Sequence, residues 1–156
     1  MAAETPIVIY HGTNTVVKNP EVRIVGYNKD FGFGFYCTRY ERQAQRWAMS
    51  KRTPHIVCVY EYTPDVCLRI KTFAEMTDEW LDFIAACRHG EAHPYDIVEG
   101  PMADDEVWDY VEDYLSGRIT REAFWALAKF KHPTHQILFC TDQALRTIKF
   151  KSYYKL

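Results

Sequence analysis

The 156-residue sequence has little net charge, no paired cysteine motif and no long hydrophobic run. Its 19 Lys and Arg residues nearly balance its 21 Asp and Glu residues, which gives a formal net charge of −2. This balance provides no general electrostatic attraction to nucleic acid or to an anionic membrane. The five cysteines are scattered, odd in number and without a CxxC pair, which is typical of a reducing cytosol.

No stretch approaches the ~20 apolar residues that span a bilayer, and the N-terminus lacks a basic region followed by a long apolar one. We therefore expect a soluble, cytoplasmic protein with no membrane partner. The length fits one domain over residues 1–156, and the 47% hydrophobic content is ample for a packed core.

Three common site motifs are also absent. The histidines show no HExxH or similarly compact spacing, so we predict no metal. Neither the GxGxxG turn of a dinucleotide fold nor the GxxxxGK[ST] phosphate loop occurs. Any nucleotide site must therefore have another construction.

Hydrophobic spacing predicts an α+β protein in which several strands are joined by helices. Buried strands are expected at Ile7–Tyr10 and His55–Tyr62, and a helix at Tyr40–Lys51. The other expected strands cover residues 22–25, 66–70, 95–98 and 136–141 and the C-terminal end. The other expected helices are capped by Thr77, opened by residues 103–105, capped by Thr120 and placed at residues 142–147.

The most informative segment is Asp30–Ala48, in which a turn rich in aromatic residues precedes a helix. Gly32 and Gly34 alternate with phenylalanines, which lets the backbone bend tightly or be approached closely. Thr38 and Glu41 have the spacing of a capping box. The predicted helix would then carry an aromatic side chain back over the turn.

That side chain is Trp47, which would face Tyr36 and form with it two aromatic walls around a flat ring such as nicotinamide. His11, beside Gly12, can donate one hydrogen bond and accept another, as a ribose hydroxyl requires. The alternative is ordinary core packing for all three side chains. A Cys37–His11 nucleophile is disfavoured because no spacing indicates an Asn or Asp that would orient the imidazole.

Two runs, YHGT at residues 10–13 and GFGFYCTRYERQAQRW at residues 32–47, resemble the ADP-ribosyltransferase superfamily, in the branch that includes the poly-ADP-ribose polymerases. The whole chain more closely resembles a family of small bacterial proteins of uncharacterised, toxin-like function. Residues 30–48, 100–105 and 136–139 fit its DFGxGFYxT…QAxxWA, GPxADD and QIxF motifs.

This resemblance implies two small, packed antiparallel sheets flanked by helices, with NAD as co-substrate. The catalytic residues it implies are His11, Tyr36 and Gln136, where Gln136 stands in place of a frequent glutamate. The NAD-binding residues would be His11, Gly12, Thr13, Asn28, Lys29, Phe35, Tyr36 and Trp47. A glutamine can hydrogen-bond but brings no charge to the oxocarbenium-like transition state. The resemblance therefore favours transfer of single units over chain elongation.

Asp104 and Asp105 would lie on the acceptor side if their loop folds over the pocket; the alternative is a helix N-cap. Lys29 would neutralise pyrophosphate, unless its segment is simply a solvated loop.

The resulting prediction is a mono-ADP-ribosyltransferase that acts on a protein or nucleic-acid acceptor, with an antitoxin protein as an expected partner. A non-catalytic NAD or ADP-ribose binding module and an NAD hydrolase stay open as alternatives. RNA-directed chemistry is disfavoured by the acidic balance. The basic and aromatic residues of 146–155 are interpreted as a solvated edge strand rather than an RNA-binding patch.

Overall fold

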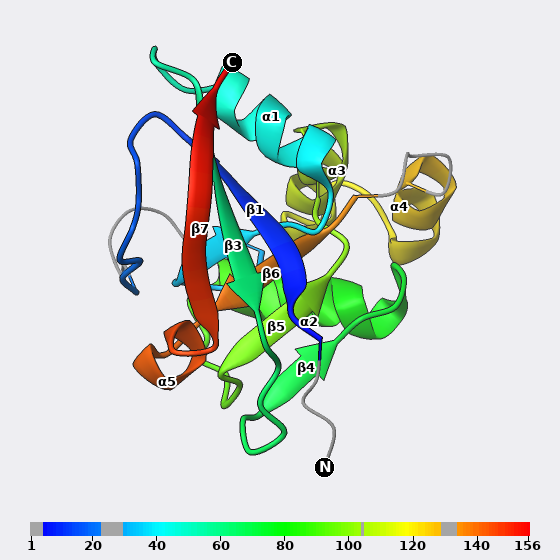
Figure 1. The fold of residues 1–156 in the computed structure, drawn as a ribbon. Helices are drawn as coiled ribbons and strands as arrows, with labels where there is room; N and C mark the ends of the chain where they lie inside the picture. The colour runs from blue at the N-terminus through cyan, green and yellow to red at the C-terminus, as the bar shows by residue number, and fades with distance from the viewer. Residues whose placement is uncertain (1–4, 23–29, 104, 129–133) are drawn as a thin grey trace.

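The computed structural model describes residues 5–22, 30–103, 105–128 and 134–156, with the side chains of residues 105, 106 and 108 outside that description. These residues form two small sheets and several helices (Figure 1). The predicted α+β class is thereby confirmed at this level.

The first sheet is entirely antiparallel. It contains β1 (Ile7–Thr13), β3 (Ile56–Tyr62) and β7 (Ile148–Lys155), in the order β1-β3-β7. Six of the seven β3 residues are buried, as expected for a central strand with a nearly continuous apolar sequence. β7 is an edge strand, in agreement with the interpretation of its Lys-rich sequence.

The second sheet contains β2 (Phe35–Cys37), β6 (Gln136–Phe139), β5 (Ile97–Gly100) and β4 (Ile70–Thr72), in the order β2-β6-β5-β4. β4 and β5 are parallel, and the other pairs are antiparallel. The two sheets meet at a bridge between Tyr10 and Thr38, whose backbone N–O distances are 2.8 and 2.9 Å. This bridge brings the middle of β1 beside the end of β2.

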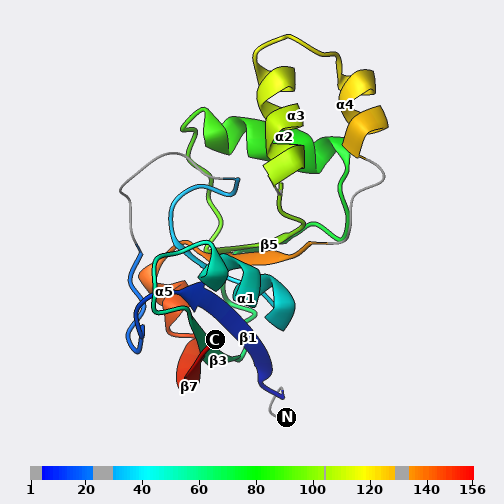
Figure 2. The same ribbon diagram turned by 90° about the horizontal axis from the view of Figure 1, so that it is seen from above.

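The helices are α1 (Glu41–Met49), α2 (Asp78–Arg88), α3 (Asp105–Leu115), α4 (Arg121–Ala128) and α5 (Asp142–Leu145). Figure 2 shows α2, α3 and α4 on one side of the four-stranded sheet, with β1, β3, β7 and α1 on the other. One core cluster joins this helical layer to Val98 and Leu138 of the sheet. A second cluster fills the space between the two sheets and includes Ile9, Tyr60 and Phe139. None of the helices in the described ranges is long and apolar enough to cross a membrane.

Several element predictions are confirmed. Thr77 caps α2 by accepting a hydrogen bond from Trp80 N at 3.2 Å, and Thr120 accepts one from Ala123 N at the start of α4. The expected strands at His55–Tyr62 and 136–141 appear as β3 and the shorter β6.

Three local predictions are wrong. The capping box predicted from Thr38 and Glu41 does not cap α1. The N-cap of α1 is Tyr40, which has no side-chain cap, and the Thr38 hydroxyl instead accepts from Tyr40 N at 3.1 Å in the preceding turn. β1 continues to Thr13, so His11 lies inside the strand rather than in a turn after it. The strand expected at 66–70 begins only at Ile70, and Val66 is 87% exposed. The strand expected at 22–25 lies mainly outside the described residues.

Candidate functional site

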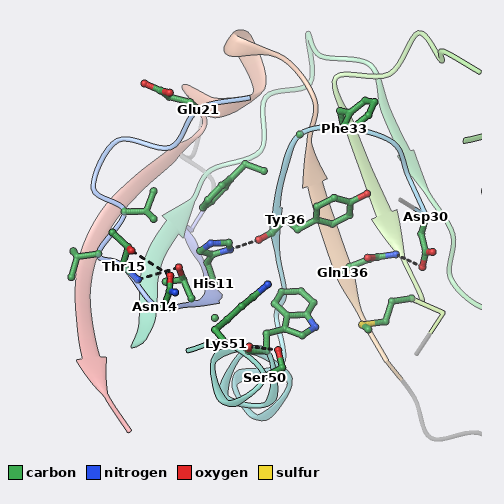
Figure 3. Close-up of a pocket in the computed structure, with 18 of the residues that line it drawn as sticks. His11, Asn14, Thr15, Glu21, Asp30, Phe33, Tyr36, Ser50, Lys51 and Gln136 are labelled. Carbon is green, nitrogen blue, oxygen red and sulfur yellow. Dashed lines mark hydrogen bonds between the residues drawn. The ribbon is translucent and has the colours of Figure 1, made fainter. Parts of the chain in front are cut away.

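A cleft lies beside the junction of the two sheets. It is lined by β1 and the segment that follows it, by the turn before β2, by the end of α1, by the loop after β5 and by the first residue of β6. Its described lining residues include His11, Gly12, Thr13, Asn14, Lys18, Asp30, Phe35, Tyr36, Trp47, Lys51 and Gln136. Figure 3 shows the labelled side chains gathered around this opening. The cleft therefore combines aromatic, cationic and amide groups from distant parts of the chain.

His11 is fixed across the junction of the sheets. Its Nδ1 atom donates to the backbone oxygen of Tyr36 at 2.6 Å, and its ring packs on Phe35 with centroids 4.4 Å apart. In the neutral imidazole this bond places the proton on Nδ1 and makes Nε2 an acceptor. The ring orientation at the cleft is thus set by the neighbouring sheet.

Gly12 allows close packing between β1 and α1. A Cβ atom at this position would lie 2.0 Å from the Ala44 oxygen and 2.8 Å from Trp47 Cβ. The absence of a side chain is therefore required by the helix that brings Trp47 to the cleft. Gly34 has a similar constraint, since its Cβ would lie 2.4 Å from the Phe139 oxygen.

Tyr36 is held by its backbone oxygen, which accepts from His11, and by its hydroxyl, which makes two hydrogen bonds. Its hydroxyl donates to Gly32 O at 2.7 Å and accepts from Phe31 N at 3.2 Å. Burial, with the Asp30 carboxylate nearby, raises the pKa of the Tyr36 phenol well above its usual range. Tyr36 is therefore a neutral aromatic group whose ring is oriented by the aromatic turn.

Gln136 begins β6 and is buried, with 5% exposure. Its Nε2 atom donates to Asp30 Oδ2 at 3.3 Å (Figure 3). Asp30 is also buried and forms an ion pair with Arg88 at the end of α2, in which Arg88 Nε lies 3.0 Å from Oδ1. Burial lowers the pKa of the Arg88 guanidinium, while the Asp30 carboxylate opposes that change. The cleft thus contains a carboxylate next to the glutamine.

A cluster of polar contacts around His135 holds the backbone just before Gln136. His135 donates through Nε2 to Glu99 Oε1 at 2.8 Å and accepts through Nδ1 from Arg39 N at 3.0 Å. Gln43 of α1 pairs with the backbone of His135, accepting from His135 N at 3.0 Å and donating to its carbonyl oxygen. These contacts fix the start of β6 from both sides.

The structure brings seven of the predicted site residues to one cleft: His11, Gly12, Thr13, Phe35, Tyr36, Trp47 and Gln136. Asn28, Lys29 and Asp104 lie outside the described residues, as does the side chain of Asp105. The roles of all these residues stay predictions.

Sequence reasoning missed the Asp30–Arg88 pair and Lys51. In the sequence, Asp30 is recognisable only as the first residue of the aromatic turn motif. Arg88 carried a usable signal, because it follows Leu81 and Ile84 on the apolar stripe of α2. A cation at a core position of a helix indicates a buried anionic partner.

The alternative in which Cys37 acts as a nucleophile is contradicted. Its side chain is fully buried, and burial raises the pKa of its thiol well above the usual range. All five cysteines are free. Within the described ranges, no three His, Cys, Asp or Glu side chains are arranged to hold a metal ion.

Fold and site together define a small α+β protein with a polar and aromatic cleft where two sheets meet. The chain belongs to the family described as a protein of unknown function (DUF3990), whose family model matches residues 7–150. None of the curated proteins compared with the chain matches it.

Proposed function

We propose that this protein is an NAD-dependent mono-ADP-ribosyltransferase, and that its two sheets form the split-sheet core of the ADP-ribosyltransferase superfamily. The observation that carries the proposal is the convergence of His11, Tyr36 and Gln136 on one cleft. These residues lie on β1, β2 and β6, and the first and last are separated by 125 positions in the chain. Their convergence is what the sequence resemblance requires of a nicotinamide riboside site.

In this proposal His11 accepts a hydrogen bond from a ribose hydroxyl, while the Gly12 backbone holds the nicotinamide amide. The rings of Tyr36 and Trp47 lie against the nicotinamide. Because Tyr36 is already oriented by its bonds to Phe31 and Gly32, little conformational freedom is lost on binding. Ring contacts of this kind contribute on the order of 1 kcal/mol each, which orients a ligand but does not break a bond.

The reaction breaks the bond between C1′ of the ribose and the nicotinamide nitrogen. The bonding electron pair leaves with nicotinamide, which departs as a neutral molecule, and the positive charge develops on the ribose. An acceptor oxygen or nitrogen then bonds to C1′ and loses its proton. Catalysis would come from positioning the ribose and from stabilising its charge in the transition state.

A non-catalytic NAD or ADP-ribose binding module is the second candidate. It is favoured by the neutral amide at position 136 and by the engagement of the Asp30 carboxylate with Arg88. Both features reduce the negative charge available to the transition state. If water replaces the acceptor, the same cleft gives an NAD hydrolase.

The test is to incubate the purified protein with NAD labelled in its adenosine part, with and without cell extract. Nicotinamide release together with label on a macromolecule supports the transferase, and mass spectrometry then identifies the acceptor. Release without label transfer indicates the hydrolase. If neither nicotinamide nor a labelled macromolecule is formed, and NAD still raises the melting temperature, the result indicates the binding module. The toxin role and its antitoxin partner stay predictions.

A further inference from the structure

We infer that Asp30 is a positioning residue that orients the Gln136 amide, so that its oxygen is presented to the ligand in the cleft as a hydrogen-bond acceptor. The inference rests on the proposed function and assigns a role to a residue outside the predicted site.

The carboxylate of Asp30 receives donors on both oxygens. Oδ1 accepts from Arg88, and Oδ2 accepts from Ala103 N at 2.8 Å and from Gln136 Nε2 at 3.3 Å. A carboxylate accepts hydrogen bonds and does not donate them, so the group of Gln136 that faces Asp30 must be its NH₂. The planar amide then turns its Oε1 atom away from Asp30, on a side chain that lines the cleft.

This arrangement explains how a glutamine serves at a position where the resemblance implies a frequent glutamate. An amide oxygen can accept a hydrogen bond from a ribose hydroxyl as a carboxylate does, but only in one of the two amide orientations. Asp30 selects that orientation. Its negative charge, one hydrogen bond away, also polarises the amide and favours electron density on Oε1.

The same arrangement opposes a glutamate at position 136. A carboxylate there would face Asp30 across the distance that a hydrogen bond now occupies, and two carboxylates so close do not both remain ionised. Asp30 and Gln136 therefore form a unit in which one member carries the charge and the other contacts the ligand.

Asp30 also has a structural role, because it links the aromatic turn, α2 and the loop after β5. The test must separate this role from the orientation of the amide. A suitable control is Asp82→Asn, which makes the same chemical change in another Asp–Arg pair. Asp82 lies 2.7 Å from Arg121, and its side chain is 59% exposed.

The first measurement is nuclear magnetic resonance of the side-chain amide of Gln136, assigned by its loss in Gln136→Leu. We expect a scalar coupling through the hydrogen bond between Gln136 Nε2 and the Asp30 carboxyl carbon. This measurement needs neither NAD nor a change at position 30. Absence of the coupling, with the amide protons exchanging as fast as those of exposed Gln143, would overturn the inference.

The second measurement is nicotinamide release by Asp30→Asn, Gln136→Glu and the double variant Asp30→Asn/Gln136→Glu. Loss of the partners that orient metal-ligating side chains costs about 10–100-fold. By analogy, we expect Asp30→Asn to lower kcat by about that factor with KM for NAD within about threefold. Asp82→Asn should match the wild type. Gln136→Glu should not exceed the wild type. The double variant should regain much of the turnover lost in Asp30→Asn, because the amide introduced at position 30 can donate to the carboxylate introduced at position 136.

Absence of nicotinamide release by the wild type, with the coupling present, would overturn the proposed function and with it the catalytic purpose of the orientation. Normal wild-type release with a folded Asp30→Asn variant of unchanged kcat would overturn the inference alone. If Asp30→Asn fails to fold, two results still decide whether Asp30 orients the Gln136 amide: the scalar coupling, and the rate of nicotinamide release by Gln136→Glu relative to the wild type. A Gln136→Glu variant that is faster and equally stable would then count against the inference.

Discussion

His11 Nδ1 lies 2.6 Å from the backbone oxygen of Tyr36, so a side chain of the three-stranded sheet is fixed to the backbone of the four-stranded one. The bond lies one residue along β1 and two residues along the other strand from the Tyr10–Thr38 bridge, which joins the same two sheets. The cleft therefore depends on how the sheets meet, and its residues can be tested separately for packing and for ligand contact.

Replacing His11 by Ala removes both the bond to Tyr36 and the contact with Phe35. We expect a loss of about 1–2 kcal/mol in unfolding free energy, measured by urea denaturation. Nicotinamide release should fall by about 100-fold or more, since the ribose loses its positioning group. His89→Ala, at the exposed end of α2, is the control and should change neither quantity. A folded His11→Ala protein with normal release would contradict the site.

Tyr36→Phe separates the ring from its hydroxyl. The variant keeps the aromatic face but leaves Phe31 N and Gly32 O without their present partner, so we expect it to lose about 1–3 kcal/mol of stability. NAD affinity should fall less than in Tyr36→Ala, because the face remains. Calorimetric titration measures both variants, with Tyr153→Phe at the 47% exposed Tyr153 as the control. Equal affinity losses in Phe and Ala would assign the effect to the hydroxyl.

Gly12→Ala tests whether this glycine is required by packing. Its Cβ would lie 2.0 Å from the Ala44 oxygen, so either α1 moves or the strand distorts, and we expect a loss of about 3 kcal/mol or more. Gly117→Ala is the comparison, because a Cβ there meets nothing within 4 Å while φ is +79°. That variant should lose only about 1–2 kcal/mol, from the backbone conformation. Thermal melting ranks the two, and equal losses would show that α1 adapts.

The spacing of apolar residues and the positions of capping and turn residues were enough to predict the α+β class and most elements. β3, α2 and α4 follow from an apolar run or from a cap whose partner is a few residues away. Local sequence predicted the start of α1 to within one residue but not its cap, because the Thr38 hydroxyl contacts Tyr40 and His135 instead, the latter 97 residues away. Such a long-range competitor is invisible in a four-residue motif.

Much of the lining of the cleft was also predictable from the sequence. The resemblance named His11, Tyr36, Trp47 and Gln136, and the fold brings them to one cleft. It did not indicate Asp30 and Arg88, which become partners through tertiary packing across 58 positions. Gly12 was predicted to lie close to a ligand, but its Cβ position is occupied by the backbone of α1, a constraint that only the packing of helix on strand reveals.

Glu99 should make stability sensitive to acid. Burial raises its pKa, but the hydrogen bonds from His135 and Arg39 outweigh burial and lower the pKa from 4.5 to about 2. The carboxylate therefore stabilises the fold above pH 4.5, and this contribution is lost as pH falls from there through about 2. The contribution is on the order of 3 kcal/mol. Glu99→Gln should destabilise the protein at pH 7 and flatten its acid transition, whereas exposed Glu75→Gln should do neither.

Lys51 supplies a test of how charge in the cleft contributes to binding. Its side chain is exposed at the end of α1 and points into the cleft (Figure 3). If the ligand is NAD, its two phosphates bring negative charge that this ammonium can offset by about 1 kcal/mol at such a solvated position. Lys51→Gln should then weaken NAD binding about fivefold at low salt and reduce its salt dependence.

The control for Lys51→Gln is Lys149→Gln on β7, because Lys149 is exposed on a strand that does not line the cleft. Nicotinamide riboside provides a matched ligand, since it keeps the ring and its ribose but carries neither phosphate. Its affinity should therefore be unchanged by Lys51→Gln, as titration calorimetry can measure. Equal weakening of both ligands would show that Lys51 shapes the riboside site rather than meeting the phosphates.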